Sequence, residues 1–146
     1  MNRIDYISDT IQNCKLLTDL SMSTNDLKRL PEAIGGLDSL VTLKLDDNRL
    51  NELPMSVGKL RNLEELVISQ NYLEALPPSI GLCRKLHTLN LDDNDIEMLP
   101  KEIGSFQLVK AQPSSQYAAF LIGGKDYATF STNIYKLLNQ NYCIYS

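Results

Sequence analysis

The chain has 146 residues, of which 43% are hydrophobic and 22% charged, and its formal net charge is −4. This composition predicts an ordinary folded, water-soluble domain, because disordered chains and membrane proteins deviate strongly from it. The negative charge disfavours nucleic acid and anionic membranes as partners, since both repel an acidic protein. Three cysteines without the spacing of a disulfide framework, and two charges within the first six residues, predict a cytoplasmic protein.

An asparagine recurs every 23 residues along the chain, at Asn2, Asn25, Asn48, Asn71 and Asn94. Internal periodicity of this length is the signature of a repeat architecture. We therefore divide the chain into repeats over residues 1–106 and a non-repeat tail, 107–146. The repeat region comprises a half-repeat, 1–16, and full repeats at 17–39, 40–62, 63–85 and 86–108, with the register secure to residue 106.

The half-repeat at the head of the chain places Ile4, Ile7, Ile11 and Cys14 at core positions. Each full repeat then opens with Leu-x-x-Leu-x-Leu or a close variant, whose alternation predicts a short strand with one apolar face. A Leu-Pro pair follows, which fixes φ, removes a backbone donor and favours an irregular or 3₁₀ return. The glycine that closes each repeat is expected to supply a backbone angle that other residues avoid.

These elements predict an α/β leucine-rich-repeat solenoid. A curved parallel sheet should line its concave face, and irregular or 3₁₀ returns should form the convex face. The asparagines at 25, 48, 71 and 94 are expected to form a structural ladder, with each amide satisfying buried backbone groups of adjacent turns. The tail is expected to be irregular or partly helical.

The polar side chains of the strands are the candidate binding residues, because solenoids bind partners on their concave face. The third, fifth, seventh and eighth positions of each repeat should point outward there. These concave-face residues are Asp19, Ser21, Ser23, Thr24, Thr42, Lys44, Asp46, Asp47, Glu65, Val67, Ser69, Gln70, Thr88, Asn90, Asp92 and Asp93. The acidic excess predicts a basic protein partner; the alternative is a solvated face without a ligand.

Other chemistry-bearing residues have simpler interpretations within the repeat. Cys14 and Cys83 share a column with core leucines, so both are expected to be small core residues rather than redox or metal groups. The segment 92–95 resembles a calcium loop, but Ile96 stands where a ligand belongs. His87 has no evident catalytic partner and is expected on the surface. We therefore expect no enzyme, metal or cofactor.

The repeat pattern resembles that of the family combining leucine-rich repeats with PDZ domains, which includes Scribble, Erbin, Densin and Lano. The segments that carry the resemblance are Leu30–Gly35, Thr42–Asp46, Glu64–Leu66, Glu74–Pro77 and Pro100–Ser105. It implies a scaffold in cell polarity, adhesion or junction organisation. It also implies a place at the cytoplasmic face of the basolateral membrane or cell junctions, with peripheral membrane association through partners.

The family has a longer array and most members add PDZ domains, so we expect this chain to be a short internal piece with an unrelated tail. A truncated isoform and an incomplete gene model both fit that expectation. The alternative function is an intracellular signalling adaptor that tethers Ras-pathway components or phosphatases. The segments Glu64–Leu66 and Glu74–Pro77 favour the polarity scaffold.

The tail differs in composition from the repeats and holds five of the seven tyrosines. Residues 111–116 are typical of a linker, and 133–139 could form a short helix. Cys143 begins a C-terminal prenylation-like motif, but Tyr145 fits its aliphatic slot poorly and one lipid anchors weakly.

Two alternatives remain for the ends of the array. The tail could cover the last apolar row with Phe120, Leu121, Tyr135 and Leu138. Otherwise that row, formed by Leu89, Leu91, Ile96 and Leu99, stays open and promotes self-association. The row at the other end, Ile4, Ile7 and Ile11, is also expected to be open.

Overall fold

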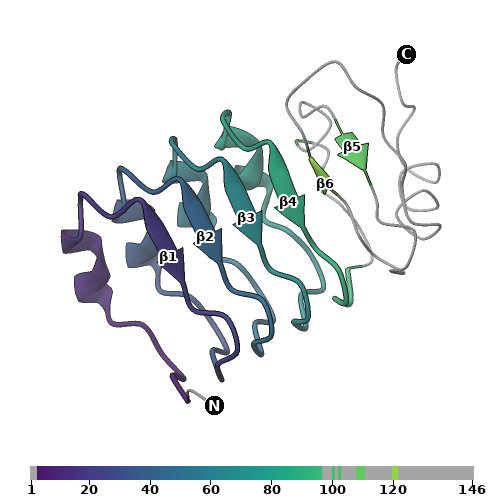
Figure 1. Ribbon diagram of the computed structural model, residues 1–146, viewed down its shortest axis with the longest axis horizontal. Coiled ribbons are helices and arrows are strands. Elements are labelled where there is room, and N and C mark those ends of the chain that lie inside the picture. Colours follow the sequence, from purple (N-terminus) through teal and green to yellow (C-terminus); the bar gives the residue numbers. More distant parts are fainter. Residues whose placement is uncertain (1–2, 97–99, 101, 103–107, 111–119, 122–146) are drawn as a thin grey trace.

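The computed structural model describes residues 3–96, 100, 102, 108–110 and 120–121. A half-turn and then successive full turns stack along one axis (Figure 1). The elements in chain order are η1 (Asp9–Asn13), β1 (Asp19–Ser21), η2 (Glu32–Gly36), β2 (Thr42–Lys44), η3 (Met55–Lys59), β3 (Glu65–Val67), η4 (Pro78–Leu82), β4 (Thr88–Asn90), β5 (Leu108–Lys110) and β6 (Phe120–Leu121), where η denotes a 3₁₀ helix.

The strands β1–β4 form one parallel sheet in sequence order. Their register follows the 23-residue period, so Leu20 pairs with Leu43, Leu43 with Leu66 and Leu66 with Leu89. The paired leucines of β2–β4 are fully buried. Their neighbours in each strand remain at least partly exposed. The sequence-based prediction of a leucine-rich-repeat solenoid is therefore confirmed.

The returns are 3₁₀ helices that begin directly after the Leu-Pro pairs. Pro31, Pro54 and Pro77 occupy the N-cap positions of η2, η3 and η4, with φ between −71° and −66° and extended ψ. This φ is the one that the proline ring imposes. The four 3₁₀ helices contact one another in chain order and form the layer opposite the strands (Figure 1).

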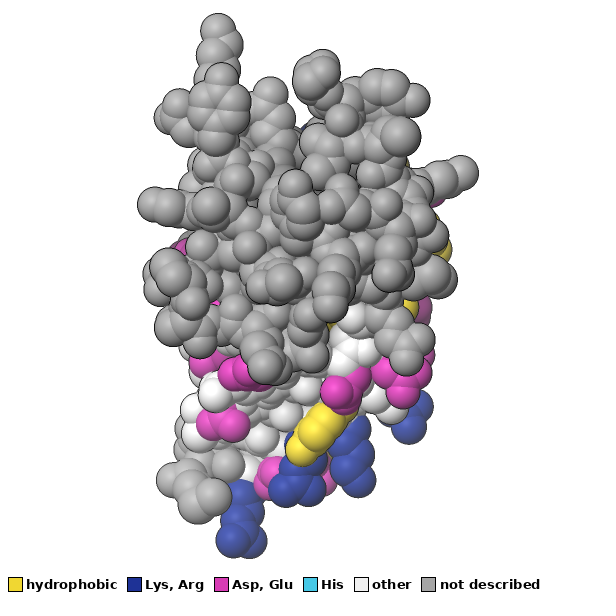
Figure 2. Space-filling view, turned by 90° about the vertical axis from the view of Figure 1, so that its right-hand side faces the viewer, with side chains coloured by type: hydrophobic (Ala, Val, Ile, Leu, Met, Phe, Trp, Pro, Cys, Tyr) yellow, Lys and Arg dark blue, Asp and Glu magenta, His cyan; other side chains and the backbone are white. Residues whose placement is uncertain are grey.

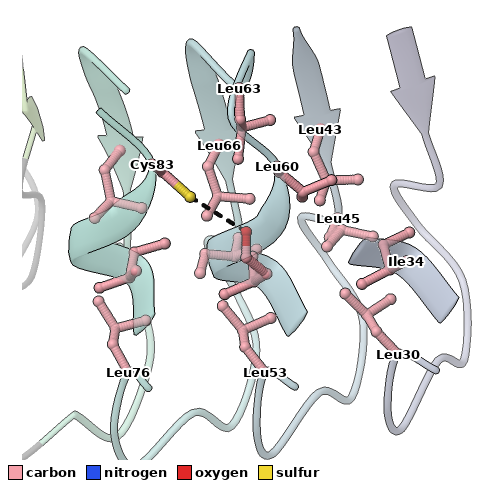
Figure 3. Packing of buried hydrophobic residues seen from close by; sticks show 14 of the residues in the cluster. Leu30, Ile34, Leu43, Leu45, Leu53, Leu60, Leu63, Leu66, Leu76 and Cys83 are labelled. Atoms are coloured by element: carbon pink, nitrogen blue, oxygen red, sulfur yellow. Dashed lines mark hydrogen bonds between the residues drawn. The ribbon is translucent and has the colours of Figure 1, made fainter. Parts of the chain in front are cut away.

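Leucine and isoleucine columns fill the space between the two layers. Leu60 and Leu66, for example, are fully buried, and Ile34 of η2 and Cys83 after η4 lie in the same core (Figure 3). Cys83 thus has the predicted core position. Cys14 does not: it is exposed. Cys14 is the C-cap residue of η1, none of whose residues is buried.

The prediction for the glycines is wrong, because none of the described glycines has a positive φ. The left-handed residues are instead Thr24, Asp47, Gln70 and Asp93, with φ of 58°, 54°, 54° and 51°. Glycine is required for close packing between turns. A Cβ at Gly58 would lie 2.5 Å from the carbonyl oxygen of Ser79, closer than real Cβ contacts allow.

Part of the tail is neither irregular nor helical, in contrast to the prediction. Strands β5 and β6 pair antiparallel, with Leu108 opposite Leu121. Their β-branched and aromatic residues favour strands. Strand β6 lies beside β4, and Leu89 of β4 is fully buried. Its burial fits the alternative in which the tail covers the last turn; the predicted helix at 133–139 lies outside the described residues.

None of the helices in the described part of the chain is long and apolar enough to span a membrane.

Candidate protein-binding face

The third and fifth residues of the repeats form two outward-facing rows of four side chains across the sheet. They flank the inward leucine of each strand, as Thr42 and Lys44 flank Leu43 in β2. All eight are at least partly exposed: Asp19, Ser21, Thr42, Lys44, Glu65, Val67, Thr88 and Asn90. Paired residues of neighbouring strands are one repeat period apart in sequence, so equivalent side chains lie next to one another across the sheet.

The seventh and eighth residues lie where the chain leaves the strand. Their backbone groups extend the ladder between turns: the amide of Asp47 donates to the carbonyl of Ser69 at 3.0 Å, and that of Gln70 to Asp92 at 2.7 Å. The backbone is thereby fixed, and the side chains at these positions are exposed or partly exposed. Aspartate suits the left-handed eighth position, since its short polar side chain tolerates that conformation.

The ladder asparagines hold these strand exits in place from within. Asn71 is buried, and its Nδ2 donates to the carbonyls of Leu45, Ile68 and Ser69 at 3.0, 3.2 and 3.0 Å. Its Oδ1 accepts from the amide of Leu50 at 2.9 Å. Asn48 and Asn94 make equivalent bonds. Each side-chain amide thus joins two successive turns, because it bonds backbone groups of its own turn and of the turn before it.

The charges of the concave face are mainly acidic. Of its sixteen residues six are acidic and one, Lys44, is basic. The Lys44 Nζ lies 3.4 Å from Glu65 Oε1, an exposed pair worth at most about 1 kcal/mol. Ser23 Oγ donates to Asp46 Oδ1 at 2.6 Å, which holds this carboxylate toward the neighbouring turn.

Two acidic pairs stand at a defined spacing along the face. Asp46 and Asp47 follow β2, whereas Asp92 and Asp93 follow β4. With adjacent strands about 4.8 Å apart, the pairs are separated by about 10 Å. In the end view of Figure 2, Lys and Arg side chains lie along the lower edge, with acidic side chains among and above them.

Sequence reasoning missed the side-chain pairs between neighbouring turns. Arg49 Nη2 lies 3.0 Å from Asp26 Oδ1, and His87 Nε2 lies 3.5 Å from Glu64 Oε2. In both pairs the partners are one repeat period apart in sequence, a signal that would have identified them. His87 is half-buried between Glu64 and Thr88, whose Oγ1 is 3.1 Å from its Nδ1.

The other chemistry-bearing groups form no catalytic arrangement in the described residues. Burial raises the pKa of the Cys83 thiol to about 11, and the Sγ–H donates to the Val57 carbonyl at 3.2 Å (Figure 3). No group of three or more His, Cys, Asp or Glu side chains that could hold a metal ion occurs within this part of the chain. Cys143 lies outside the described residues.

Comparison with known proteins identifies the class of this chain. A leucine-rich-repeat family model matches residues 38–96. A solved leucine-rich-repeat protein of Leptospira interrogans is similar, with 35% identity, a TM-score of 0.67, and coverage of 70% of this chain and 26% of that one. The chain is a leucine-rich-repeat protein. No curated protein matches its sequence.

Two Arabidopsis thaliana structures to which this chain is similar are complexes. The ectodomain of the receptor kinase GASSHO1/SCHENGEN3, in complex with CASPARIAN STRIP INTEGRITY FACTOR 2, is 28% identical, with a TM-score of 0.64 and coverage of 86% of this chain and 14% of that one. The BIR3–SERK2 complex is 28% identical, with a TM-score of 0.61 and coverage of 84% of this chain and 60% of that one. This leucine-rich-repeat chain thus spans less than two thirds of the length of each of these three proteins.

Proposed function

We propose that this protein is an interaction scaffold that binds a basic protein segment through its concave face. The observation that carries the proposal is the pair of acidic clusters, Asp46 with Asp47 and Asp92 with Asp93, on rigidly bonded strand exits. A fixed acidic surface attracts basic partners and discriminates against acidic ones. The complexes of the Arabidopsis receptor ectodomain and of BIR3 with SERK2 support a protein as the kind of ligand.

A charge-removal variant tests this proposal. The variant keeps side-chain size and the left-handed turns but removes three charges; it combines Asp46→Asn, Asp47→Asn and Asp93→Asn. Proteins captured by the wild-type chain should be captured at least tenfold less by this variant, as measured by quantitative mass spectrometry. Their capture by the wild type should also fall as salt rises, because screening weakens exposed charge attraction.

The matched control removes the same number of charges elsewhere. Asp5→Asn, Glu52→Gln and Glu74→Gln together change three exposed carboxylates outside the concave face and give the same formal net charge as the test variant. Capture by this control should equal that of the wild type. Equal losses in the two variants would mean that net charge, rather than the concave face, determines binding.

We further propose a role in cell polarity, adhesion or junction organisation, at the cytoplasmic face of the membrane. The support is the resemblance carried by segments such as Glu64–Leu66 and Glu74–Pro77. Proximity labelling in polarised cells separates this role from the alternative of a signalling adaptor. Enrichment of junction proteins supports the polarity scaffold, whereas enrichment of Ras-pathway components or phosphatases supports the adaptor.

A further inference from the structure

A basic surface lies on the loops that lead from η3 into β3 and from η4 into β4, along the upper edge of the array in Figure 1. In each loop one residue is buried, Leu60 or Cys83, and it anchors the loop to the core. The neighbouring cations are all exposed: Lys59, Arg61, Arg84 and Lys85. These four residues are here called the basic edge.

The same hydrogen bond fixes the backbone of both loops. The Arg61 amide donates to the Lys59 carbonyl at 2.8 Å, and the Arg84 amide donates to the Leu82 carbonyl at 2.9 Å. Strands β3 and β4 pair with a shift of one repeat, and η3 contacts η4. Arg61 and Arg84, which are one repeat apart, therefore occupy adjacent places on the basic edge.

Lys85 is held toward the turn that carries Arg61. Its Nζ donates to Asn62 Oδ1 at 2.7 Å, and Asn62 Nδ2 donates to the Asp38 carbonyl at 2.8 Å. The Asn62 amide is neutral, so this bond positions the ammonium group without neutralising it. An ammonium group has three donors, so Lys85 can bind an anion at the same time.

The basic edge differs from the rest of the described surface because no carboxylate compensates its charge. Elsewhere carboxylates pair with a cation or histidine of a neighbouring turn: Lys15 with Asp38, Asp26 with Arg49, Lys44 with Glu65 and Glu64 with His87. None of these pairs in the described chain includes a residue of the basic edge.

The contrast is clearest within one column of the repeat. Asp38, one repeat before Arg61, lies 3.0 Å from Lys15 of the preceding turn. In the next two turns the same column contains Arg61 and then Arg84, so like charges stand on adjacent turns. Their mutual repulsion would be relieved by an anion that binds both.

The two arginines suit carboxylates in particular. A guanidinium group donates two parallel hydrogen bonds to one carboxylate, which an ammonium group cannot do. Adjacent strands are about 4.8 Å apart and alternate side chains of an extended peptide about 7 Å apart, a difference that long arginine side chains can span. Leu82 is 59% exposed beside Arg84 and offers an apolar contact at the same place.

The small size of the basic edge favours a peptide over a membrane surface. It spans only the loops of two adjacent turns. The exposed carboxylate of Asp38 and the partly exposed carboxylate of Glu64 lie on either side of Arg61 in sequence or column. A planar anionic surface would be repelled by these carboxylates, whereas a narrow acidic segment can avoid them.

We propose that the basic edge binds a short acidic segment of a protein partner. Carboxylates of the segment bond Arg61 and Arg84, and an adjacent apolar side chain contacts Leu82. Lys59 and Lys85 increase the attraction and the rate of association. This site lies at the opposite end of the strands from the acidic strand exits, so it is independent of the basic partner proposed for the concave face.

A synthetic peptide provides the probe. A fluorescein-labelled peptide of sequence GEELEEG carries alternate carboxylates and one leucine. We expect saturable binding to the full chain by fluorescence anisotropy, with an affinity that falls as salt rises. The peptide GQQLQQG, which lacks the charges, should bind at least tenfold more weakly.

A charge-removal variant of the protein tests the arginines. The chain with Arg61→Gln and Arg84→Gln should bind GEELEEG at least tenfold more weakly. Its melting temperature should be unchanged or higher, because the variant loses a repulsion and no ion pair. Leu82→Ser should weaken binding at least threefold.

Two control variants keep the basic edge intact. The chain with Lys28→Gln and Arg29→Gln loses the same number of exposed positive charges in the loop between β1 and η2, and it should bind GEELEEG like the wild type. The charge-removal variant of the concave face should bind this peptide at least as tightly as the wild type does. Failure of the concave-face proposal therefore leaves this test unaffected.

Four results would overturn the proposal. The first is equal binding of GEELEEG and GQQLQQG, or no binding of either. The second is equal loss of binding in the arginine variant and in the Lys28 and Arg29 control, or no loss in the arginine variant. The third is a lower melting temperature of the arginine variant, which would give the arginines a structural role. The fourth is sedimentation of the chain with vesicles containing about 30% phosphatidylserine that the arginine variant abolishes and GEELEEG does not compete, since a membrane would then be the occupant.

Discussion

Asn71 makes four hydrogen bonds with one buried amide, and its removal should be strongly destabilising. Asn71→Ala leaves the Leu50 amide without its partner. It also removes one of two donors from the carbonyls of Leu45, Ile68 and Ser69, which keep their bonds to Asn48, Asn94 and the Asp47 amide. An unsatisfied buried group costs about 1–3 kcal/mol, so we expect a loss of about 1–3 kcal/mol in urea titration. Exposed Glu74→Ala should change stability by no more than about 0.5 kcal/mol. Equal losses in both variants would contradict a structural role for the ladder.

The change in stability caused by Gly58→Ala tests whether this glycine is needed for close packing, because the two explanations predict changes of opposite sign. Because Gly58 has no positive φ, its backbone conformation alone predicts that Gly58→Ala stabilises the protein by about 0.4–1 kcal/mol through the unfolded chain. The close approach to Ser79 instead predicts overpacking and a loss of about 1–3 kcal/mol. Gly36→Ala is the control: its Cβ meets Gln12 of the terminal helix η1, which can move more easily. It should therefore destabilise less; a thermal melt of both variants measures the difference.

Cys83 should be chemically inert in the folded state. With a pKa of about 11 instead of 9.0, its thiolate fraction at pH 8 is about a hundredfold lower than normal, and its side chain is also inaccessible. In a Cys14→Ser, Cys143→Ser background, labelling by a disulfide reagent should occur only as the turn opens. Rapid native labelling, comparable to that of exposed Cys14 in a Cys83→Ser, Cys143→Ser chain, would contradict this placement.

At the residue scale the sequence predicts which repeat positions are inward-facing, but not every physical reason for the residue type found there. Leu43, Asn71 and Cys83 could be placed because the period assigns each an inward position. The glycine column was misinterpreted, since a sequence pattern does not distinguish a required φ from a required close approach. Gly58 is needed for a contact with Ser79, 21 positions away, and that distance is set only when turns stack.

At the scale of the element, the strand exit is where the turns carry backbone strain. Its eighth residue is left-handed in every full repeat, and Asp47 and Asp93 suit that conformation better than Gln70 does. Gln70→Asn should therefore stabilise the protein by about 0.5–1 kcal/mol, a part of the penalty for a non-glycine left-handed residue. Ser69→Asn, at the preceding residue, should give no such gain. Urea titration of the two variants tests the difference.

Strands and returns were predictable because each is encoded within 23 residues. The Leu-x-Leu alternation and the Leu-Pro pair act locally, so β2 and η3 could be located from sequence. Pairing between distant segments was not predictable. The antiparallel pair of β5 with β6 depends on chain outside the repeat, and nothing in the 23-residue pattern specifies its register.

At the scale of the whole molecule, stability should depend on the number and quality of interfaces between turns. Each turn contacts its neighbours in a one-dimensional stack, so the ends determine how far unfolding spreads. The two ends differ. At β1 the row of Leu17, Leu20 and Met22 is partly exposed, whereas Leu89 and Leu91 at β4 are buried.

The burial of the β4 row predicts that residues 107–146 protect the last turn. Strand β6 lies beside β4, so deletion of 107–146 should expose Leu89 and Leu91. Full exposure of a leucine costs about 1.5–3 kcal/mol, so the melting temperature should fall and the exposed row should promote larger particles in light scattering. A chain ending after Leu121 keeps β5 and β6 and should retain most of the stability. If the chain lacking 107–146 melts and sediments like the full chain, the tail does not cap the array. If both truncated chains are equally destabilised, residues beyond Leu121 provide the protection instead of β6.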